Sequence, residues 1–150
     1  MDKERLIERI SSNEGFRGFA YKDTLGNFTI GYGRKITPDQ AEHDYRLGVS
    51  SAEAYSMLED DVNKTIAACQ DRFPWFEYLN DIRQEVVVEM AFQLGVYGVS
   101  LFQGMIRAIK NNDWALAADE MLNSAWHKQT PSRCESLANL MLNGYNEETT

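Results

Sequence analysis

The spacing of hydrophobic residues changes near residue 16 and again near residue 37. In residues 2–12, Leu6, Ile7 and Ile10 form one apolar stripe with the period of an α-helix, and Asp2 can cap its start. The polar run Ser11-Ser12-Asn13 then ends the stripe. The pattern predicts an N-terminal helix over residues 2–12, with Glu14 just beyond its C-terminal end.

Residues 16–33 follow a different pattern. Aromatic and β-branched residues fill 19–21 and 28–32, and a polar segment at 23–27 separates them. This arrangement predicts a β-hairpin with a turn of several residues. The alternation along 28–32 places Phe28, Ile30 and Tyr32 on one face and Thr29 on the other. Residues 34–36 are expected to add a short third strand.

From residue 37 onward the sequence is dominated by helix start and stop signals. Thr37-Pro38-Asp39-Gln40 and Ser50-Ser51-Ala52-Glu53 both read as capping boxes, which predicts a short helix ending at Gly48 and a longer one ending before Pro74. Further helices are expected to begin at Asn80, Ser100, Asn112 and Thr130-Pro131, with Gly95 and Gly144 as stop signals. A small β region followed by a helical body defines an α+β fold that is predominantly α.

Length and charge narrow the range of functions. The chain has 150 residues, 43% of them hydrophobic, which suits one globular domain, and we expect a monomer. The formal net charge of −8 argues against nucleic acid or an anionic membrane as the main partner. No segment has the continuous apolar run of a membrane span or a secretory signal, so we expect synthesis in the cytoplasm without membrane insertion.

The metal-ligating residue types are few and scattered. Cys69 and Cys134 are the only cysteines, and we expect both to be reduced, buried thiols rather than a disulfide. His43 and His127 are isolated in the sequence. We therefore predict neither a metal site nor a cofactor.

Glu14 and Asp23 are the carboxyl groups whose surroundings could differ most. The negative end of the preceding helix and the nearby Phe16 and Phe19 favour the protonated form of Glu14, as a general acid requires. Asp23, in a polar turn, should stay ionised, and two carboxyl groups in different protonation states are typical of glycoside hydrolysis. Each residue also has an ordinary interpretation: a solvated helix end for Glu14, local turn hydrogen bonds for Asp23, and strand propensity for Thr29.

The combination is more specific than its parts. The segment from Glu14 to Gly33 follows the pattern E-G-x-R-x-x-x-Y-x-D-x-x-G-x-x-T-I-G-x-G without a gap. This pattern resembles the active-site hairpin of phage-type lysozymes, the family of the T-even phage enzymes (glycoside hydrolase family 24). The resemblance implies a lysozyme-like fold with a cleft, Glu14 as the general acid, and Asp23 with Thr29 positioning the attacking water.

Two later blocks resemble the same family. Residues 91–95, with the sequence AFQLG, look like the central-helix segment of the cleft floor, and residues 126–133 match W-x-x-Q-T-P-x-R. The resemblance assigns substrate contacts in these blocks to Phe92, Gln93, Trp126, Gln129 and Thr130, although Phe92 and Trp126 could equally be core residues. It places Arg133 close to Glu14, where a positive charge would oppose protonation of the acid, so the net effect at Glu14 stays open.

The chain departs from the family at several positions. Arg34, after the glycine pair Gly31 and Gly33, replaces a histidine that T-even enzymes pair with an aspartate, and we predict an Arg34–Asp61 ion pair within 4 Å. Asn13 stands where some relatives have aspartate and Ser136 where T-even enzymes have arginine, while residues 35–50 do not align and form a shorter segment.

The resemblance also divides the domain into lobes. It predicts a β-containing lobe at 14–50, a linking helix at 51–72, and a helical lobe from 1–13 and 73–150.

The net charge of −8 would repel an anionic cell wall. It implies that the enzyme works in a confined space or has a cleft less acidic than its surface, and that moderate salt improves lysis.

The implied activity is hydrolysis of the β-1,4 bond between N-acetylmuramic acid and N-acetylglucosamine, with inversion. The expected partner is the peptidoglycan glycan strand, reached after release from the cytoplasm, as for a phage endolysin, a prophage lysozyme or an antibacterial effector. Two alternatives stay open: a catalytically weak peptidoglycan-binding member of the same fold, and a lytic transglycosylase. The intact Glu14, Asp23 and Thr29 count against the first, and the water-positioning pair Asp23 and Thr29, which would have no purpose in a transglycosylase, counts against the second.

Overall fold

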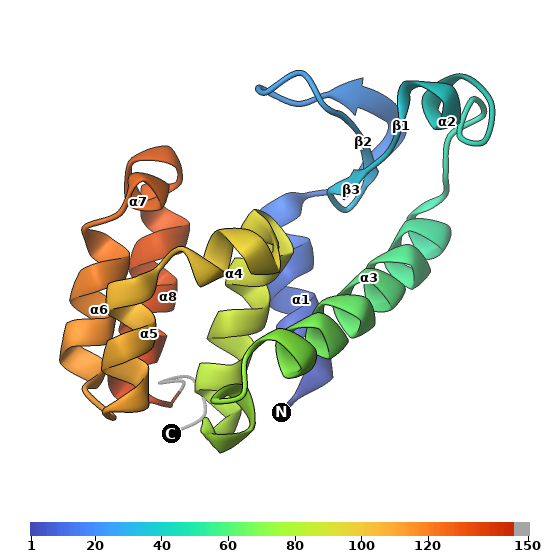
Figure 1. The fold of residues 1–150 in the computed structure, drawn as a ribbon. Helices are drawn as coiled ribbons and strands as arrows, with labels where there is room; N and C mark the ends of the chain where they lie inside the picture. Colours follow the sequence, from blue (N-terminus) through green and yellow to red (C-terminus); the bar gives the residue numbers. More distant parts are fainter. Residues whose placement is uncertain (146–150) are drawn as a thin grey trace. The chain divides into compact units, whose positions relative to one another are not determined.

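A computed structural model describes residues 1–145, and the chain falls into two units. One unit is Lys3–Lys64, and the other is Met1–Asp2 together with the chain from Thr65 onward. The first contains every strand of the described chain and the second is helical, which confirms the predominantly α, α+β class (Figure 1). This division groups the N-terminal helix with the sheet, whereas the expected lobes grouped residues 1–13 with the helical part.

Helix α1 (Lys3–Glu14) begins the first unit and buries the predicted stripe of Leu6, Ile7 and Ile10. It runs two residues beyond its expected end, so Glu14 is its last residue instead of the first residue after it. Gly15 explains the difference, because it adopts φ 71° and donates its N–H to the carbonyl of Ser11 at 3.0 Å. A glycine in this left-handed conformation satisfies the last turn of a helix.

Three antiparallel strands follow in the order β1 (Arg17–Lys22), β2 (Phe28–Gly31) and β3 (Arg34–Lys35), as predicted. Tyr21 pairs with Thr29 across β1 and β2, and a register shift lies between Arg17 and Tyr21. Ile30 has no exposed surface and Thr29 is 4% exposed. Both faces of β2 are therefore covered at this point, instead of the single covered face that alternation implied.

Both predicted capping boxes are present. In α2 (Pro38–Glu42), Thr37 Oγ1 accepts the N–H of Gln40, and the Gln40 side chain accepts the N–H of Thr37. Ser50 and Glu53 exchange the same two bonds at the start of α3 (Ser51–Arg72). These bonds satisfy donors that a helix start leaves free.

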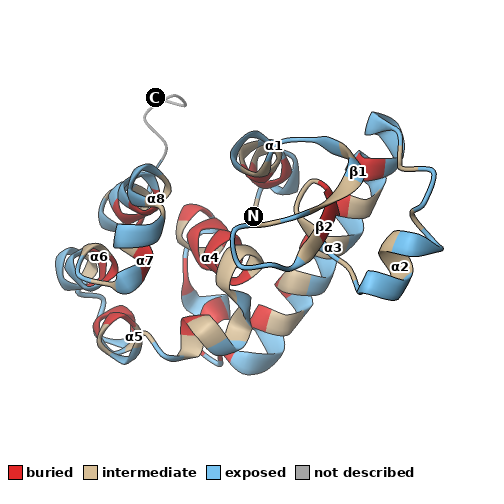
Figure 2. Cartoon of the chain, turned by 90° about the horizontal axis from the view of Figure 1, so that it is seen from above, coloured by how far each residue is buried: buried red, intermediate tan, exposed pale blue. Residues whose placement is uncertain are grey.

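The second unit contains the 3₁₀ turn η1 (Phe76–Tyr78) and helices α4 (Asp81–Ser100), α5 (Gln103–Lys110), α6 (Trp114–Leu122), α7 (Ala125–Gln129) and α8 (Pro131–Asn143). The buried positions of α4, α6 and α8 appear in red in Figure 2. The predicted cap at Asn80 is confirmed by its bond from the N–H of Arg83. Gly144 ends α8 at φ 73°, as expected.

Two boundary predictions in this unit were wrong. Ser100 caps nothing, because its hydroxyl donates to the carbonyl of Tyr97 and α5 begins only at Gln103. Asp113, one residue after Asn112, accepts the N–H of Leu116 and caps α6. The stop predicted at Gly95 is present, because Gly95 has the non-helical angles φ 79° and ψ 156°; a second helical stretch of α4 continues after this kink to Ser100. A polar residue before an apolar run therefore marks a helix start only to within a few residues.

Both cysteine thiols are free and buried, as predicted. Desolvation by burial raises the pKa of Cys69 to about 12 and that of Cys134 to about 11. Among residues 1–145, no group of three His, Cys, Asp or Glu side chains is placed to bind a metal ion. No single helix in that range is long and apolar enough to cross a membrane; α4 and α5 reach the required length and composition only as a pair bent by 95°.

Candidate active site

Glu14 packs directly against the turn between β2 and β3. A Cβ atom added to Gly33 would lie 2.6 Å from Oε2 of Glu14 and 3.1 Å from its Cδ. Gly33 also has φ +80°, a conformation that L side chains rarely adopt. The absence of a side chain at residue 33 thus makes room for the Glu14 carboxyl group.

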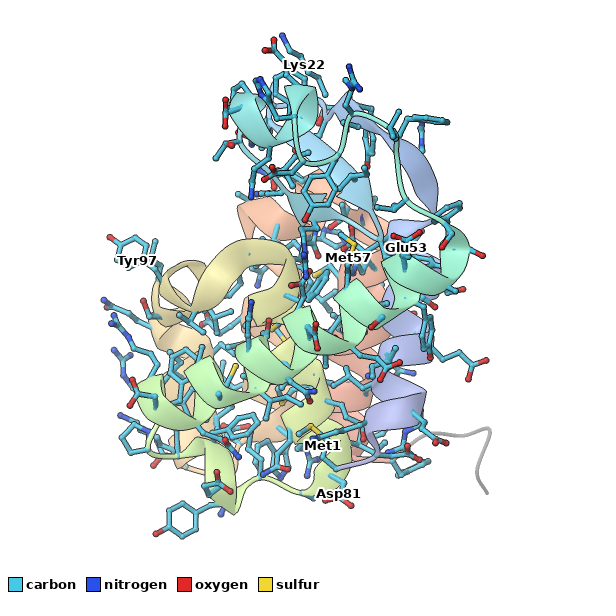
Figure 3. The ribbon with its side chains drawn as sticks, turned by 90° about the vertical axis from the view of Figure 1, so that its right-hand side faces the viewer. Met1, Lys22, Glu53, Met57, Asp81 and Tyr97 are labelled. Carbon is cyan, nitrogen blue, oxygen red and sulfur yellow. The ribbon has the colours of Figure 1, made fainter. Side chains whose placement is uncertain are left out.

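Gly31, the other member of the glycine pair, has a different contact. It has φ +69°, and a Cβ atom there would lie 3.3 Å from the Cβ of Ala54 on α3. The side chain of Met57, labelled in Figure 3, is also within 4 Å of this position. Gly31 therefore lets β2 pack closely on α3, which fixes the strand that carries Thr29.

Asp23 opens the hairpin turn and holds it together. Its Oδ1 accepts the N–H groups of Leu25 and Asn27, both at 2.9 Å, and its own N–H donates to the carbonyl of Asn27 at 2.9 Å. This is the local turn role that its position suggested. Because these turn bonds use Oδ1 alone, the turn itself makes no demand on the second carboxylate oxygen.

Thr29 is connected to Asp23 through one residue. Its hydroxyl donates to the carbonyl of Asn27 at 3.3 Å, while Asn27 donates its N–H to Asp23. Asn27 thus fixes the Asp23 carboxylate and the Thr29 hydroxyl at the same end of the hairpin. This connection had no signal in the sequence beyond the family pattern.

The predicted Arg34–Asp61 ion pair is confirmed. The guanidinium is bidentate, with Nε 3.0 Å from Asp61 Oδ2 and Nη2 2.8 Å from Asp61 Oδ1. Nη2 also donates to the carbonyl of Met57 at 3.2 Å, and Nη1 to the hydroxyl of Tyr45 at 3.4 Å. The hydrogen bonds to Asp61 and, less strongly, to Tyr45 raise the pKa of Arg34, so β3 is held to α3 by a permanent charge.

Four of the predicted substrate-contact residues lie close to one another in the second unit. Trp126 donates its indole N–H to Gln93 Oε1 at 2.9 Å, and Gln93 Nε2 donates to Thr130 Oγ1 at 3.2 Å. Trp126 is only 3% exposed and its ring meets Phe102 edge-on at 6.1 Å. Trp126 and Gln129 also line a cavity of about 470 Å³ with Leu94, Phe102 and Glu120.

Arg133 lies in the same unit and has a partner that the sequence did not reveal. Its Nε donates to Oε2 of Glu89 on α4 at 3.1 Å. Glu89 has no exposed surface, and neither has Glu85 one turn earlier on α4. Neither carboxylate could be recognised from the sequence as a buried, paired group, because that stretch of α4 has the pattern of an apolar core helix.

Most of the net negative charge lies outside the unit that carries Glu14. Residues 3–64 have nine Lys and Arg against eleven Asp and Glu, while the remaining residues have six against twelve. The unit that carries the hairpin is therefore itself close to electrically balanced. Weak net charge there reduces the long-range repulsion of an anionic polymer.

The hairpin thus has one carboxyl group, Glu14, against Gly33 and a second, Asp23, linked to Thr29 through Asn27. Glycoside hydrolases use a pair of carboxyl groups. Comparison with known proteins agrees. The phage lysozyme family model matches residues 11–140. The chain is 28% identical over 160 residues to probable T4-type lysozyme 1 of Dictyostelium discoideum and 29% identical to probable T4-type lysozyme 2 of the same organism, in each case over 93% of this chain and 94% of the relative.

A third relative contains the domain as part of a longer protein. The pre-baseplate central spike protein Gp5 of Enterobacteria phage T4 is 29% identical over 159 residues, which cover 93% of this chain and 28% of Gp5. The chain therefore belongs to the phage lysozyme family and is a glycoside hydrolase, as the resemblance of its hairpin implied.

Proposed function

We propose that the chain cleaves the β-1,4 bond between N-acetylmuramic acid and N-acetylglucosamine in peptidoglycan, with inversion at the anomeric carbon. The observation that carries the proposal is the arrangement of the hairpin. Glu14 is seated on Gly33 at one end of the strands, and Asp23 and Thr29 are joined through Asn27. Membership of the phage lysozyme family, whose model matches residues 11–140, supports this class of reaction.

The chemistry assigns one proton transfer to each carboxyl group. Glu14 donates its proton to the glycosidic oxygen as the bond from that oxygen to the anomeric carbon breaks. A water molecule held by Asp23 and Thr29 attacks the anomeric carbon from the opposite face and gives its proton to Asp23. General acid and base catalysis of this kind contributes about 10²- to 10⁴-fold for each group.

The second unit supplies glycan contacts in this proposal. Phe92, Gln93, Gln129 and Thr130 present partly or fully exposed side chains that can contact the sugars. Trp126 acts differently because it is buried and its N–H is taken by Gln93. We assign to Trp126 the role of fixing the orientation of the Gln93 amide, so that this amide can hydrogen-bond to the glycan.

The stereochemistry of the product tests the proposed inverting hydrolysis. A soluble tetrasaccharide fragment of peptidoglycan is incubated with the enzyme, and the anomeric protons of the new reducing end are followed by NMR. We expect the α-anomer of N-acetylmuramic acid to appear first and then to mutarotate. An initial β-anomer would contradict the direct attack of water, and the absence of any new reducing end would contradict hydrolysis.

The double role of Asp23 gives a separate prediction. An asparagine at residue 23 can still accept the N–H groups of Leu25 and Asn27, but it cannot take a proton from water. We expect Asp23→Asn to lower kcat by about 10²-fold or more while the melting temperature stays close to that of the wild type. Steady-state kinetics and thermal denaturation measure the two effects.

Asp23→Ala is the matched control, because it removes the turn hydrogen bonds together with the charge. It should lose activity and also destabilise the hairpin by about 1–2 kcal/mol. Wild-type activity in Asp23→Asn would show that Asp23 serves the turn alone.

A further inference from the structure

Helix α4 carries two carboxylates with no exposed surface, Glu85 and Glu89, one turn apart. Burying a charged group is costly unless other groups compensate for the lost water. Glu89 is compensated by Arg133, whose Nε lies 3.1 Å from Glu89 Oε2 and whose side chain is 10% exposed. Removing one partner of a buried ion pair destabilises a protein far more than replacing both partners by apolar residues.

The next turn of α4 makes a second connection, which also reaches the start of α8. Gln93, four residues after Glu89, donates to Thr130 Oγ1 and accepts from Trp126. Residues four apart lie on the same face of a helix. Glu89 and Gln93 therefore form two consecutive links from α4 to the start of α8, through Arg133 and Thr130.

The start of α8 depends on these links more than an ordinary helix start does. Thr130 is its N-cap, yet its side chain caps no N–H and instead accepts from Gln93. Arg133 lies in the first turn, where a positive charge is unfavourable beside the positive end of the helix dipole. The Glu89 carboxylate offsets that charge at a fixed position.

We propose that Glu89 is a positioning residue for glycan binding. It holds Arg133, and with it the first turn of α8, so that Thr130 and Gln93 keep the arrangement in which they contact the substrate. The inference rests on the proposed function for the identity of the ligand. The contacts of Glu89 themselves are given by the structure.

Glu85 provides a matched control for the effect of burial. It lies on the same helix, is equally buried, and accepts the backbone N–H of Asp2 at 3.4 Å. Glu85→Gln and Glu89→Gln make the same chemical change at two equally buried positions. A fall in binding caused merely by removing a buried charge from α4 would therefore appear in both variants.

The experiment measures binding to insoluble peptidoglycan by sedimentation, with both variants placed in a Glu14→Gln background so that no cleavage is expected. We expect Glu89→Gln to raise the Kd about tenfold, which corresponds to about 1.4 kcal/mol, and Glu85→Gln to leave it within twofold. In the active background, Glu89→Gln should raise KM more than it lowers kcat. Equal effects of the two variants, or an unchanged Kd in Glu89→Gln, would overturn the positioning role.

A second variant keeps the test decisive if Glu89→Gln does not fold. Glu89→Gln with Arg133→Gln removes both charges, so no unpaired charge is buried, and it should fold and still show the raised Kd. Binding with wild-type affinity by this folded double variant would overturn the proposal. Because binding is measured without turnover, failure of the proposed hydrolysis is seen separately, as the lack of new reducing ends with the wild-type enzyme.

Discussion

Glu14→Gln is expected to lower the rate of peptidoglycan hydrolysis by about 10²- to 10⁴-fold, the usual contribution of a general acid. Glutamine keeps the shape of the side chain and its place against Gly33, but it has no acidic proton to give to the glycosidic oxygen. The variant should fold normally and still sediment with peptidoglycan. Release of reducing ends from purified peptidoglycan measures the loss.

Glu8→Gln on the same helix is the control, because Glu8 is exposed and two turns closer to the N-terminus. It should keep wild-type activity. A Glu14→Gln variant that hydrolyses peptidoglycan at the wild-type rate would remove Glu14 from the mechanism.

The second large effect is expected at Gly33. An alanine there would place its Cβ 2.6 Å from Glu14 Oε2, closer than such atoms approach, so the carboxyl group has to move. We expect Gly33→Ala to reduce kcat by about 10²-fold, since a misplacement of roughly 1 Å in a catalytic group has that effect. The positive φ of Gly33 adds a stability loss of about 1–2 kcal/mol.

Gly26→Ala separates the two effects of the Gly33 substitution. Gly26 has φ +84°, but a Cβ atom there meets nothing within 4 Å. It should therefore show the stability loss without the fall in kcat. Similar kcat values for both alanine variants, measured on folded protein, would show that contact with Glu14 at residue 33 has no role in catalysis.

Local features of the fold were predictable from the sequence because their causes are local. The capping boxes at Thr37 and Ser50 depend on residues three apart, and both are present. The end of α1 was misplaced by two residues because Gly15, not the preceding polar run, ends the helix. The helix start predicted at Ser100 was wrong for a related reason, since the Ser100 hydroxyl donates to the carbonyl of Tyr97, three residues earlier.

Contacts between distant residues were predictable only where the family pattern supplied them. The Arg34–Asp61 pair spans 27 residues and was expected from the histidine–aspartate pair of the T-even enzymes. The Glu89–Arg133 pair spans 44 residues and was not expected. A glutamate within an apolar helix has no sequence signal for its partner, because burial and pairing arise only when the helices pack.

Asp23 shows how an ordinary and a catalytic interpretation can both apply to one residue. The turn bonds of Oδ1 confirm the ordinary interpretation. They also fix the carboxylate in one orientation, which a residue that holds a water molecule requires. The proposed role of Asp23 in catalysis therefore uses the turn geometry instead of competing with it.

Digestion of purified peptidoglycan by the wild-type enzyme and by Glu14→Gln, with the new fragment ends identified by mass spectrometry, tests the central claim most directly. We expect the wild type to release fragments with reducing N-acetylmuramic acid ends and Glu14→Gln to release almost none. Anhydro-muramic ends would identify a transglycosylase. Binding without fragments from the wild type would contradict the proposed hydrolysis altogether.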